Sequence, residues 1–353
     1  STWRRFFCVP ETEFEYLISM RIKIPFIIVL LTLLSACGAS YSGATTDHFD
    51  GTSFHHHREV PNRGLGSFLK WVSNRDQEEW PEWVNIPEAA TPPQRSKKLR
   101  VQFVNHATVL VQLDGVNILT DPIWADRASP VSWAGPARHK APGLRFDQVP
   151  PIDLVVISHN HYDHLNVETL ATLQARDKPL VLVGLGNQAY LEDQEVKTSE
   201  LDWWETRSVQ KLEVTFVPVQ HWSSRSMFDR GQSLWGGYFI KGPSGSIYFG
   251  GDSGYGPHYS ETRRRLGAPD VALLPVGAYE PRWFMAAHHM NPDDAAAAHL
   301  DLGAKQSLGI HWGTFQLTDE GMNTPVRDLS LALRKYNIAP ENFQTVENGG
   351  VLK

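Results

Sequence analysis

Short apolar runs rich in β-branched residues recur along residues 99–353, bounded by glycine, proline or polar residues. Runs of this length and composition are typical of buried strands. The strands predicted in this way are 152–157, 179–183, 212–219, 234–240, 246–249, 271–275, 307–310 and 343–346. A β-hairpin is also predicted, because Asp114-Gly115 separates the apolar runs 107–113 and 116–120.

Stretches of helical character lie between several of these strands, at 166–176, 187–193, 291–302 and 326–336. Asn291, followed by Pro292 and two acidic residues, is typical of a helix start, and Gly303 of the end of the same helix. The alternation of strands and helices predicts an α/β domain over residues 99–353.

A cluster of histidines and carboxylates follows the predicted strand 152–157. Its residues are His159, His161, Asp163 and His164, with Tyr162 among them. The cluster lies between a strand and a helix, where α/β sheets commonly bind ligands. Imidazole nitrogens and carboxylate oxygens are ligands for zinc, iron or manganese. A tight loop can direct alternate side chains to two points, so we expect His159 and His161 at one metal and Asp163 and His164 at a second.

Further polar residues follow later strands. His221, Asp252 and His311 each come shortly after an apolar run, and glycines flank Asp252. Each residue alone is more typical of a structural role, but their order after the cluster favours a shared site. Asp121, at the end of the hairpin, and His106, just before it, fit a turn or a site equally well.

The string His159–His164 resembles the signature of the metallo-β-lactamase superfamily. This resemblance implies a four-layer αββα sandwich with the metal site at one edge, between two sheets. It also implies that His221 completes the first metal's ligands, that His311 completes the second's, and that Asp252 bridges both. Two divalent cations are expected, most simply zinc. Water held between them would lose its proton near neutral pH and act as the nucleophile.

Other strings resemble the N-acyl-phosphatidylethanolamine-hydrolysing phospholipases D. They are Thr120-Asp121-Pro122-Ile123, the metal loop with Tyr162, Trp283-Phe284-Met285, His289-Met290-Asn291-Pro292 and Ile310-His311-Trp312-Gly313-Thr314-Phe315. The resemblance implies hydrolysis of a lipid phosphodiester to phosphatidic acid and an N-acylethanolamine. It implies that Asp121 and His289 are catalytically important, and that Tyr162 and His289 touch substrate.

Three alternatives remain open at this point. The same dinuclear centre could serve a lactonase acting on a sugar lactone or lactone phosphate. It could hold iron for redox chemistry. It could also stabilise a non-catalytic surface protein, although the apparently complete ligand set argues against that.

Composition limits the partners. The chain has 353 residues, a formal net charge of −6 and 41% hydrophobic residues. The acidic balance argues against a nucleic-acid partner. The resemblance implies a phospholipid or another small ester as the substrate. Two cysteines, Cys8 and Cys37, exclude a disulfide framework.

The first part of the chain has the pattern of a targeting segment. Met20, Arg21 and Lys23 precede the apolar run 26–34, which ends in Leu34-Ser35-Ala36-Cys37. This ending resembles a bacterial lipobox, so residues 1–37 are predicted to be an upstream extension and a lipoprotein-type signal peptide. Lipidated Cys37 would anchor the chain to a membrane in the bacterial periplasm. Residues 38–98 are predicted to form a solvated tether, over 38–60, and an N-terminal wrap, over 61–98. Residues 99–353 are predicted to form the hydrolase domain.

Overall fold

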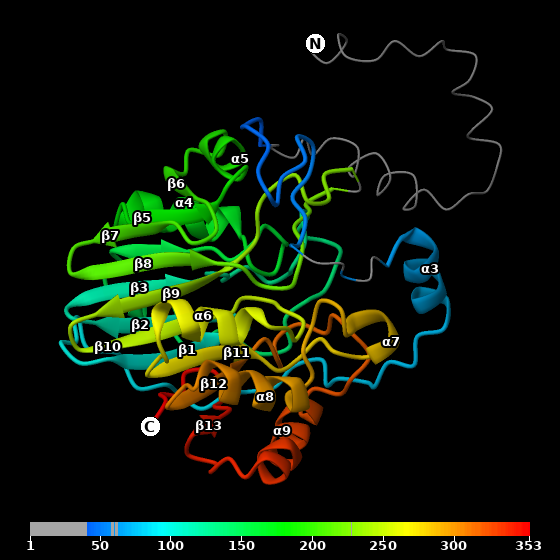
Figure 1. The fold of residues 1–353 in the computed structure, drawn as a ribbon. Helices are drawn as coiled ribbons and strands as arrows, with labels where there is room; N and C mark the ends of the chain where they lie inside the picture. The colour runs from blue at the N-terminus through cyan, green and yellow to red at the C-terminus, as the bar shows by residue number, and fades with distance from the viewer. Residues whose placement is uncertain (1–40, 58–59, 61–62, 227) are drawn as a thin grey trace, which may run out of the picture. The chain divides into compact units, whose positions relative to one another are not determined.

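The computed structural model describes residues 41–57, 60, 63–226 and 228–353 (Figure 1). The predicted signal segment and Cys37 lie outside the described residues. In the part that is described, every helix is too short or too polar to cross a membrane.

Within the described residues the strands form two sheets. The six-stranded sheet has the order β1-β2-β3-β4-β5-β6, and the seven-stranded sheet has the order β13-β12-β11-β10-β9-β8-β7. In both sheets antiparallel pairs come first along the chain and parallel pairs follow. The strands are β1 (Arg100–Asn105), β2 (Thr108–Leu113), β3 (Val116–Thr120), β4 (Leu154–Val156), β5 (Leu180–Gly184), β6 (Thr198–Leu201), β7 (Thr206–Val209), β8 (Leu212–Val217), β9 (Gly237–Gly242), β10 (Gly245–Phe249), β11 (Val271–Pro275), β12 (Gln306–Ile310) and β13 (Phe343–Gln344).

Helices cover the outer face of each sheet (Figure 1). The described helices are α3 (Leu65–Ser73), η1 (Phe146–Gln148), α4 (Val167–Arg176), α5 (Gln188–Glu192), α6 (His258–Leu266), α7 (Arg282–Met285), α8 (Pro292–Leu302) and α9 (Thr324–Tyr336). Leucines of α4 and α5 pack on the six-stranded sheet, whereas α6, α8 and α9 pack on the seven-stranded sheet.

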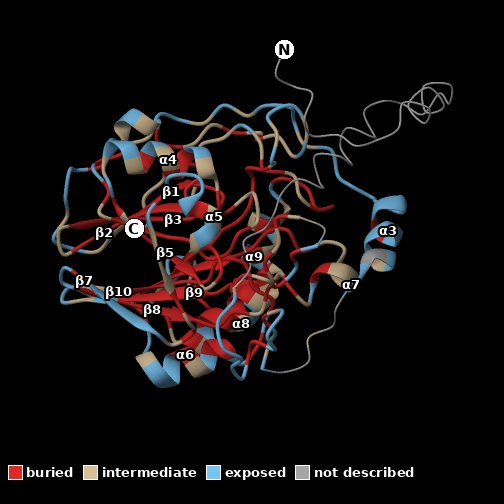
Figure 2. Ribbon diagram, turned by 90° about the horizontal axis from the view of Figure 1, so that it is seen from above, coloured by how far each residue is buried: buried red, intermediate tan, exposed pale blue. Residues whose placement is uncertain are grey.

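The alternation of side chains along each strand explains the layers. In β2, Val109 and Val111 face the space between the sheets, and Leu110 faces the helices. In β11, Leu273 faces the other sheet and Leu274 faces the helices. Both faces of both sheets are therefore buried, as Figure 2 shows by the red strands between paler helices. The predicted αββα sandwich is confirmed.

Several local predictions are also confirmed. Asp114 and Gly115 have φ values of 54° and 86°, as a primed hairpin turn between β2 and β3 requires. The Asn166 side chain caps α4 by accepting from the backbone N–H of Thr169 at 2.9 Å. Asn291 caps α8, and Gly303 ends it with a φ of 63°.

Other elements differ from the predictions. β4 is shorter than 152–157, because the chain leaves the sheet after Val156 to form the site loop. β9 begins at Gly237 rather than at 234, although Leu234 and Trp235 are buried beneath it. The polar helix α6 and the short edge strands β6 and β7 were missed, because few of their residues are apolar enough to give a pattern.

The prediction of a solvated tether does not hold for residues 41–57. Phe49 and Phe54 are 1% and 4% exposed and join the core between the sheets. His48 Nε2 donates to the Asp202 carboxylate at 2.7 Å, and its ring stacks on Trp203. The polar composition of this stretch hides two anchoring aromatic residues, so the wrap on the domain begins before residue 60.

Candidate metal centre

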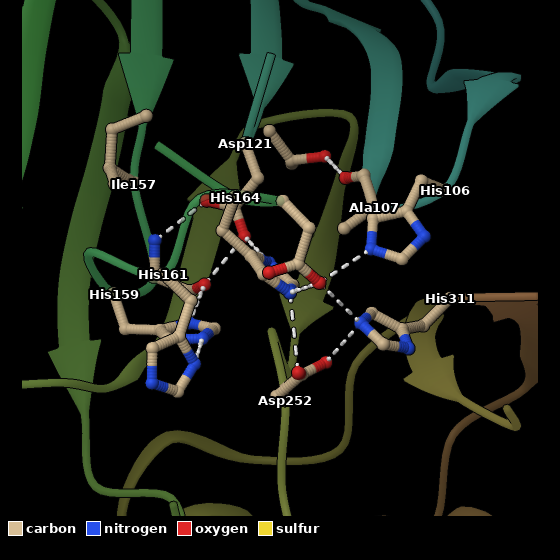
Figure 3. A network of polar contacts seen from close by, with 12 residues as sticks. His106, Ala107, Asp121, Ile157, His159, His161, His164, Asp252 and His311 are labelled. Carbon is tan, nitrogen blue, oxygen red and sulfur yellow. Dashed lines mark hydrogen bonds and ion pairs between the residues drawn. The ribbon is translucent and has the colours of Figure 1, made fainter. Parts of the chain in front are cut away.

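The polar residues predicted at strand ends meet at one edge of the sandwich (Figure 3). They come from the loop after β4 and from the segments that follow β8, β10 and β12. Strands of both sheets point toward this edge, so ends that are distant in sequence converge. All seven predicted ligand residues lie in groups whose nitrogen and oxygen atoms are close enough to hold a cation.

The first group consists of three histidines. His159 Nε2 lies 2.8 Å from His161 Nδ1, which lies 3.2 Å from His221 Nε2. Asp252 Oδ2 lies 3.8 Å from the same nitrogen of His221. These atoms face a common point, so this group could hold one metal ion.

The second group contains Asp163, His164 and His311. Asp163 Oδ2 lies 3.3 Å from His164 Nε2 and 3.2 Å from His311 Nε2. Asp252 approaches the same two histidines, with Oδ2 at 3.2 Å from His164 and Oδ1 at 3.2 Å from His311. The carboxylate of Asp252 therefore lies beside both groups, and Figure 3 shows it between His164 and His311.

These donor atoms fit divalent cations. Ligands at about 2.0–2.1 Å from a tetrahedral zinc ion lie about 3.3 Å from one another, close to most of the separations found here. Several of the donor atoms, among them His164 Nε2 and Asp252 Oδ1, are buried without a hydrogen-bond partner among the described residues. Such atoms are normally paired, and a bound cation would satisfy them.

The protonation states also suit a metal. Burial lowers the pKa of His161 to about 3 and holds the pKa of His159 and His221 well below the usual range. These three imidazoles are therefore neutral, which is the form that binds metal. At the second group burial opposes protonation, but Asp252 and Asp163 raise the pKa of His311 to about 9. The two carboxylates thus attract positive charge to this point.

Asp121 lies close enough to His159 and His164 to share a cation with them, but both of its carboxylate oxygens already accept hydrogen bonds from Ser158 and His164. It is fully buried, and its carboxylate accepts from the backbone N–H of Ser158 at 2.7 Å and from His164 Nδ1 at 2.6 Å. This contact fixes the tautomer of His164 with Nε2 free for a metal. The geometry makes Asp121 a positioning residue.

Two other contacts orient ligands in the same way. The Ser158 hydroxyl lies 2.9 Å from His159 Nδ1, and His221 Nδ1 donates to the backbone carbonyl of His288 at 3.0 Å. Backbone conformation contributes at Gly251, whose φ is 54° and which packs so tightly on Ser158 that a Cβ atom would clash with it. Gly251, the glycine before Asp252, therefore allows the backbone to approach Ser158 in the loop after β4 closely.

His106 belongs to the centre, although the sequence alone fitted either a turn or a site role for this residue. Its Nε2 lies 2.9 Å from Asp163 Oδ2, and its ring centroid lies 4.0 Å from that of His311. Burial lowers its pKa to about 3. His106 lies in the turn between β1 and β2, with a φ of 46°. Asp163 follows β4 of the same six-stranded sheet, so the strand order within that sheet brings the two residues together.

The predicted substrate residues differ in their surroundings. His289 Nδ1 lies 3.8 Å from Asp252 Oδ2, and its side chain is 16% exposed, so it borders the centre and can be reached from outside. The Tyr162 hydroxyl donates to the backbone carbonyl of Arg225 at 2.9 Å, and the Arg225 guanidinium lies over its ring. Tyr162 is therefore held in place by Arg225.

The aromatic string before His289 has a mixed environment. Trp283 is 42% exposed, Met285 is buried, and Phe284 stacks on Trp71 with ring centroids 5.2 Å apart. Packing thus accounts for Phe284 and Met285, and Trp283 alone of the three presents an apolar surface to solvent.

Known proteins resemble this chain in both sequence and fold. The profile described as a β-lactamase superfamily domain matches residues 116–312. N-acyl-phosphatidylethanolamine-hydrolyzing phospholipase D 1 of Caenorhabditis elegans is 37% identical over 263 residues, which cover 70% of this chain and 74% of the relative. The metal-dependent hydrolase MK1542 of Methanopyrus kandleri is 32% identical over 256 residues, covering 69% of this chain and 97% of the relative.

A solved structure shows the same architecture. The isothiocyanate hydrolase from Delia radicum gut bacteria superposes with a TM-score of 0.58 at 19% identity, covering 72% of this chain and 98% of the other. At this identity the likeness concerns the fold alone. Together with the matched profile and the metal-ligand geometry, it places the chain in one class: it belongs to the metallo-β-lactamase superfamily. The chain is a metal-dependent hydrolase, and the sequence resemblance to this superfamily is confirmed.

Proposed function

We propose that this hydrolase cleaves the distal phosphodiester bond of N-acyl-phosphatidylethanolamine-type lipids. The products are phosphatidic acid and an N-acylethanolamine. The centre holds two divalent cations, most simply zinc. The observation that carries the proposal is the position of Asp252 between two ligand groups, in a chain 37% identical to a relative named for this reaction.

In this proposal the ligands divide as the distances do. His159, His161 and His221 would hold the first cation. Asp163, His164 and His311 would hold the second, and Asp252, which lies beside both groups, would serve both. When bound, the cations supply Lewis acidity toward the phosphate oxygens and activate water.

The chain's own residues then orient the substrate. His289 borders the centre, and burial lowers its pKa to about 4, so its imidazole is neutral near pH 7. A neutral imidazole donates one hydrogen bond, which can position the leaving oxygen of the ethanolamine. His106 holds the Asp163 carboxylate by its Nε2–H, and Asp121 holds the His164 imidazole, so neither side chain can rotate freely out of the site.

The test uses the purified, metal-analysed chain on mixed vesicles that contain N-acyl-phosphatidylethanolamine, in water enriched in ¹⁸O. Release of N-acylethanolamine with the label in phosphatidic acid supports attack at phosphorus. Label found only in the alcohol product would mean attack at carbon and would overturn the mechanism. Turnover of a sugar lactone, with none on any N-acyl phospholipid, would overturn the substrate assignment in favour of a lactonase.

His289→Ala separates substrate contact from metal binding. We expect turnover to fall by about 10²-fold or more, as for loss of a positioned proton donor, while both metals are retained. His139→Ala is the control, because the His139 ring bonds the carbonyl of Pro81 and packs edge-on against Trp80, outside the centre. Unchanged turnover, or loss of metal in parallel with activity, would remove His289 from the substrate site.

We further propose that the chain is a lipoprotein of the bacterial periplasm, anchored to a membrane through lipidated Cys37. The support is the sequence Leu34-Ser35-Ala36-Cys37 after a charged and then apolar segment. A lipid anchor suits an enzyme whose substrate lies in the membrane. Cys37→Ala should move the protein from the membrane fraction to the soluble periplasmic fraction, whereas Cys8→Ala should not. Unchanged membrane retention of Cys37→Ala would refute the anchor.

A further inference from the structure

A cavity of about 600 Å³ lies beside the metal centre. The N-terminal segment forms one wall and includes His56. The opposite wall contains Trp222, Arg230, Trp235 and His288, together with the metal ligand His221. A cavity of this size is typical of small-molecule sites, and His221 is common to the cavity and the centre.

The wall from the N-terminal segment is fixed in place. Phe54 is buried in the core, and its backbone N–H donates to the carbonyl of Gly231 at 2.7 Å. The His56 ring donates from Nε2 to the backbone carbonyl of His221 at 2.8 Å and packs edge-on against Trp235. The segment therefore closes the cavity and contacts the loop that carries a metal ligand.

The opposite wall carries a cation on an aromatic ring. The Arg230 guanidinium lies 3.9 Å from the centroid of Trp222, and no carboxylate pairs with it among the described residues. The Trp222 ring also packs edge-to-face with His161 of the metal centre, with centroids 4.3 Å apart. Among the described residues, those that line the cavity include arginine and histidines but no aspartate or glutamate. The cavity is thus complementary to an anion.

His288 is the second observation that points to a ligand. Its side chain lines the cavity and is buried, with the residue only 9% exposed. Neither ring nitrogen has a hydrogen-bond partner in the described part of the chain. Buried polar atoms are normally paired, so a ligand in the cavity would satisfy an imidazole that the protein leaves unpaired.

We propose that this cavity binds the phosphate-bearing glycerol head of the substrate. Arg230 pairs with an anionic phosphate oxygen, since a guanidinium matches such an oxyanion with two N–H groups. His288 bonds an oxygen of the glycerol part, and Trp222 and Trp235 pack against its carbons. This inference rests on the proposed function, because it assigns the same substrate's head to the space next to the metals.

The test measures binding of glycerol 3-phosphate and of glycerol to the metal-loaded chain by isothermal titration calorimetry. Arg230→Gln should weaken glycerol 3-phosphate binding about tenfold. Arg230→Lys should weaken it less, because lysine keeps the positive charge but lacks the paired N–H donors of the guanidinium. His288→Ala should also weaken it. Glycerol should bind poorly to every variant. Metal content should be the same throughout.

Arg265→Gln is the matched control, since Arg265 lies over Trp204 at 4.1 Å, outside the cavity residues. Its affinity for glycerol 3-phosphate should equal that of the unmodified chain. Equal affinity in Arg230→Gln and His288→Ala would overturn the inference. If the chain hydrolyses no lipid but binds glycerol 3-phosphate in a way that depends on Arg230, the proposed reaction is refuted and the anion site remains supported. The two failures can therefore be told apart.

Discussion

Asp121→Asn tests how far the metal centre depends on a residue that orients a metal ligand. One carboxylate oxygen of Asp121 accepts from the backbone N–H of Ser158, and the other accepts from His164 Nδ1 and from the Ser158 hydroxyl. An asparagine has one acceptor and one donor group in the same place. If the asparagine oxygen faces the backbone N–H of Ser158, its NH₂ group faces His164 Nδ1. This favours the His164 tautomer with the proton on Nε2, the nitrogen that should bind a metal. If the amide is turned round, its NH₂ group faces the backbone N–H of Ser158, so two donors meet.

Either orientation loses one charge-assisted hydrogen bond in a fully buried site. Such a bond contributes roughly 1.5–3 kcal/mol. Since about 1.4 kcal/mol corresponds to a factor of ten, the expected loss is roughly 10- to 100-fold. Mutation of outer contacts that orient metal ligands commonly has an effect of this size. The loss should fall on the cation at His164 and leave the group around His159 largely occupied.

The assay combines elemental analysis of dialysed protein, metal affinity by competition with a chelator, and turnover. The control is Asp153→Asn, because Asp153 accepts from the backbone N–H of Asn117 at 2.8 Å at the opposite end of β3 and β4. The control should keep its metals. Full metal affinity and full turnover in Asp121→Asn would refute the reasoning that this contact fixes His164.

Three further predictions concern the centre and its surroundings. Asp252→Asn should lower the occupancy of both cation sites, whereas His159→Ala should mainly empty one. Elemental analysis measures the metal content of each variant, and an equal loss of metal in the two would contradict the shared role of Asp252. Gly251→Ala should destabilise the fold by about 1–3 kcal/mol, through strain at its positive φ and overpacking, and a melting curve like that of the unmodified chain would argue against this. Although burial opposes it, hydrogen bonds to Asp202 and Asp47 raise the pKa of His48 above 6.5. The stability gained over His48→Gln should therefore be complete below about pH 6.5 and fall as pH rises through the raised pKa, as urea unfolding at several pH values would show.

Local pattern was enough to determine most of the architecture. Apolar runs, the Asp114-Gly115 turn and the caps Asn166 and Asn291 act over a few residues, so the sequence around each one predicts its structure. The loop from His159 to His164 is similarly local, and its spacing was specific enough to indicate a metal site. Elements with few apolar residues, such as α6, gave no such signal.

Contacts between distant segments were decided only by tertiary structure. Asp121 meets His164 across 43 residues, and His106 meets Asp163 across 57, so no sequence spacing identifies either pair. The polar segment before residue 60 resembled a tether, yet Phe49 and Phe54 are buried in the core and thereby bring His56 to the metal edge. Hydrophobic periodicity reports which residues are buried. The partner of a buried polar group depends on which strand ends become neighbours, through the strand order within a sheet and the packing of the two sheets.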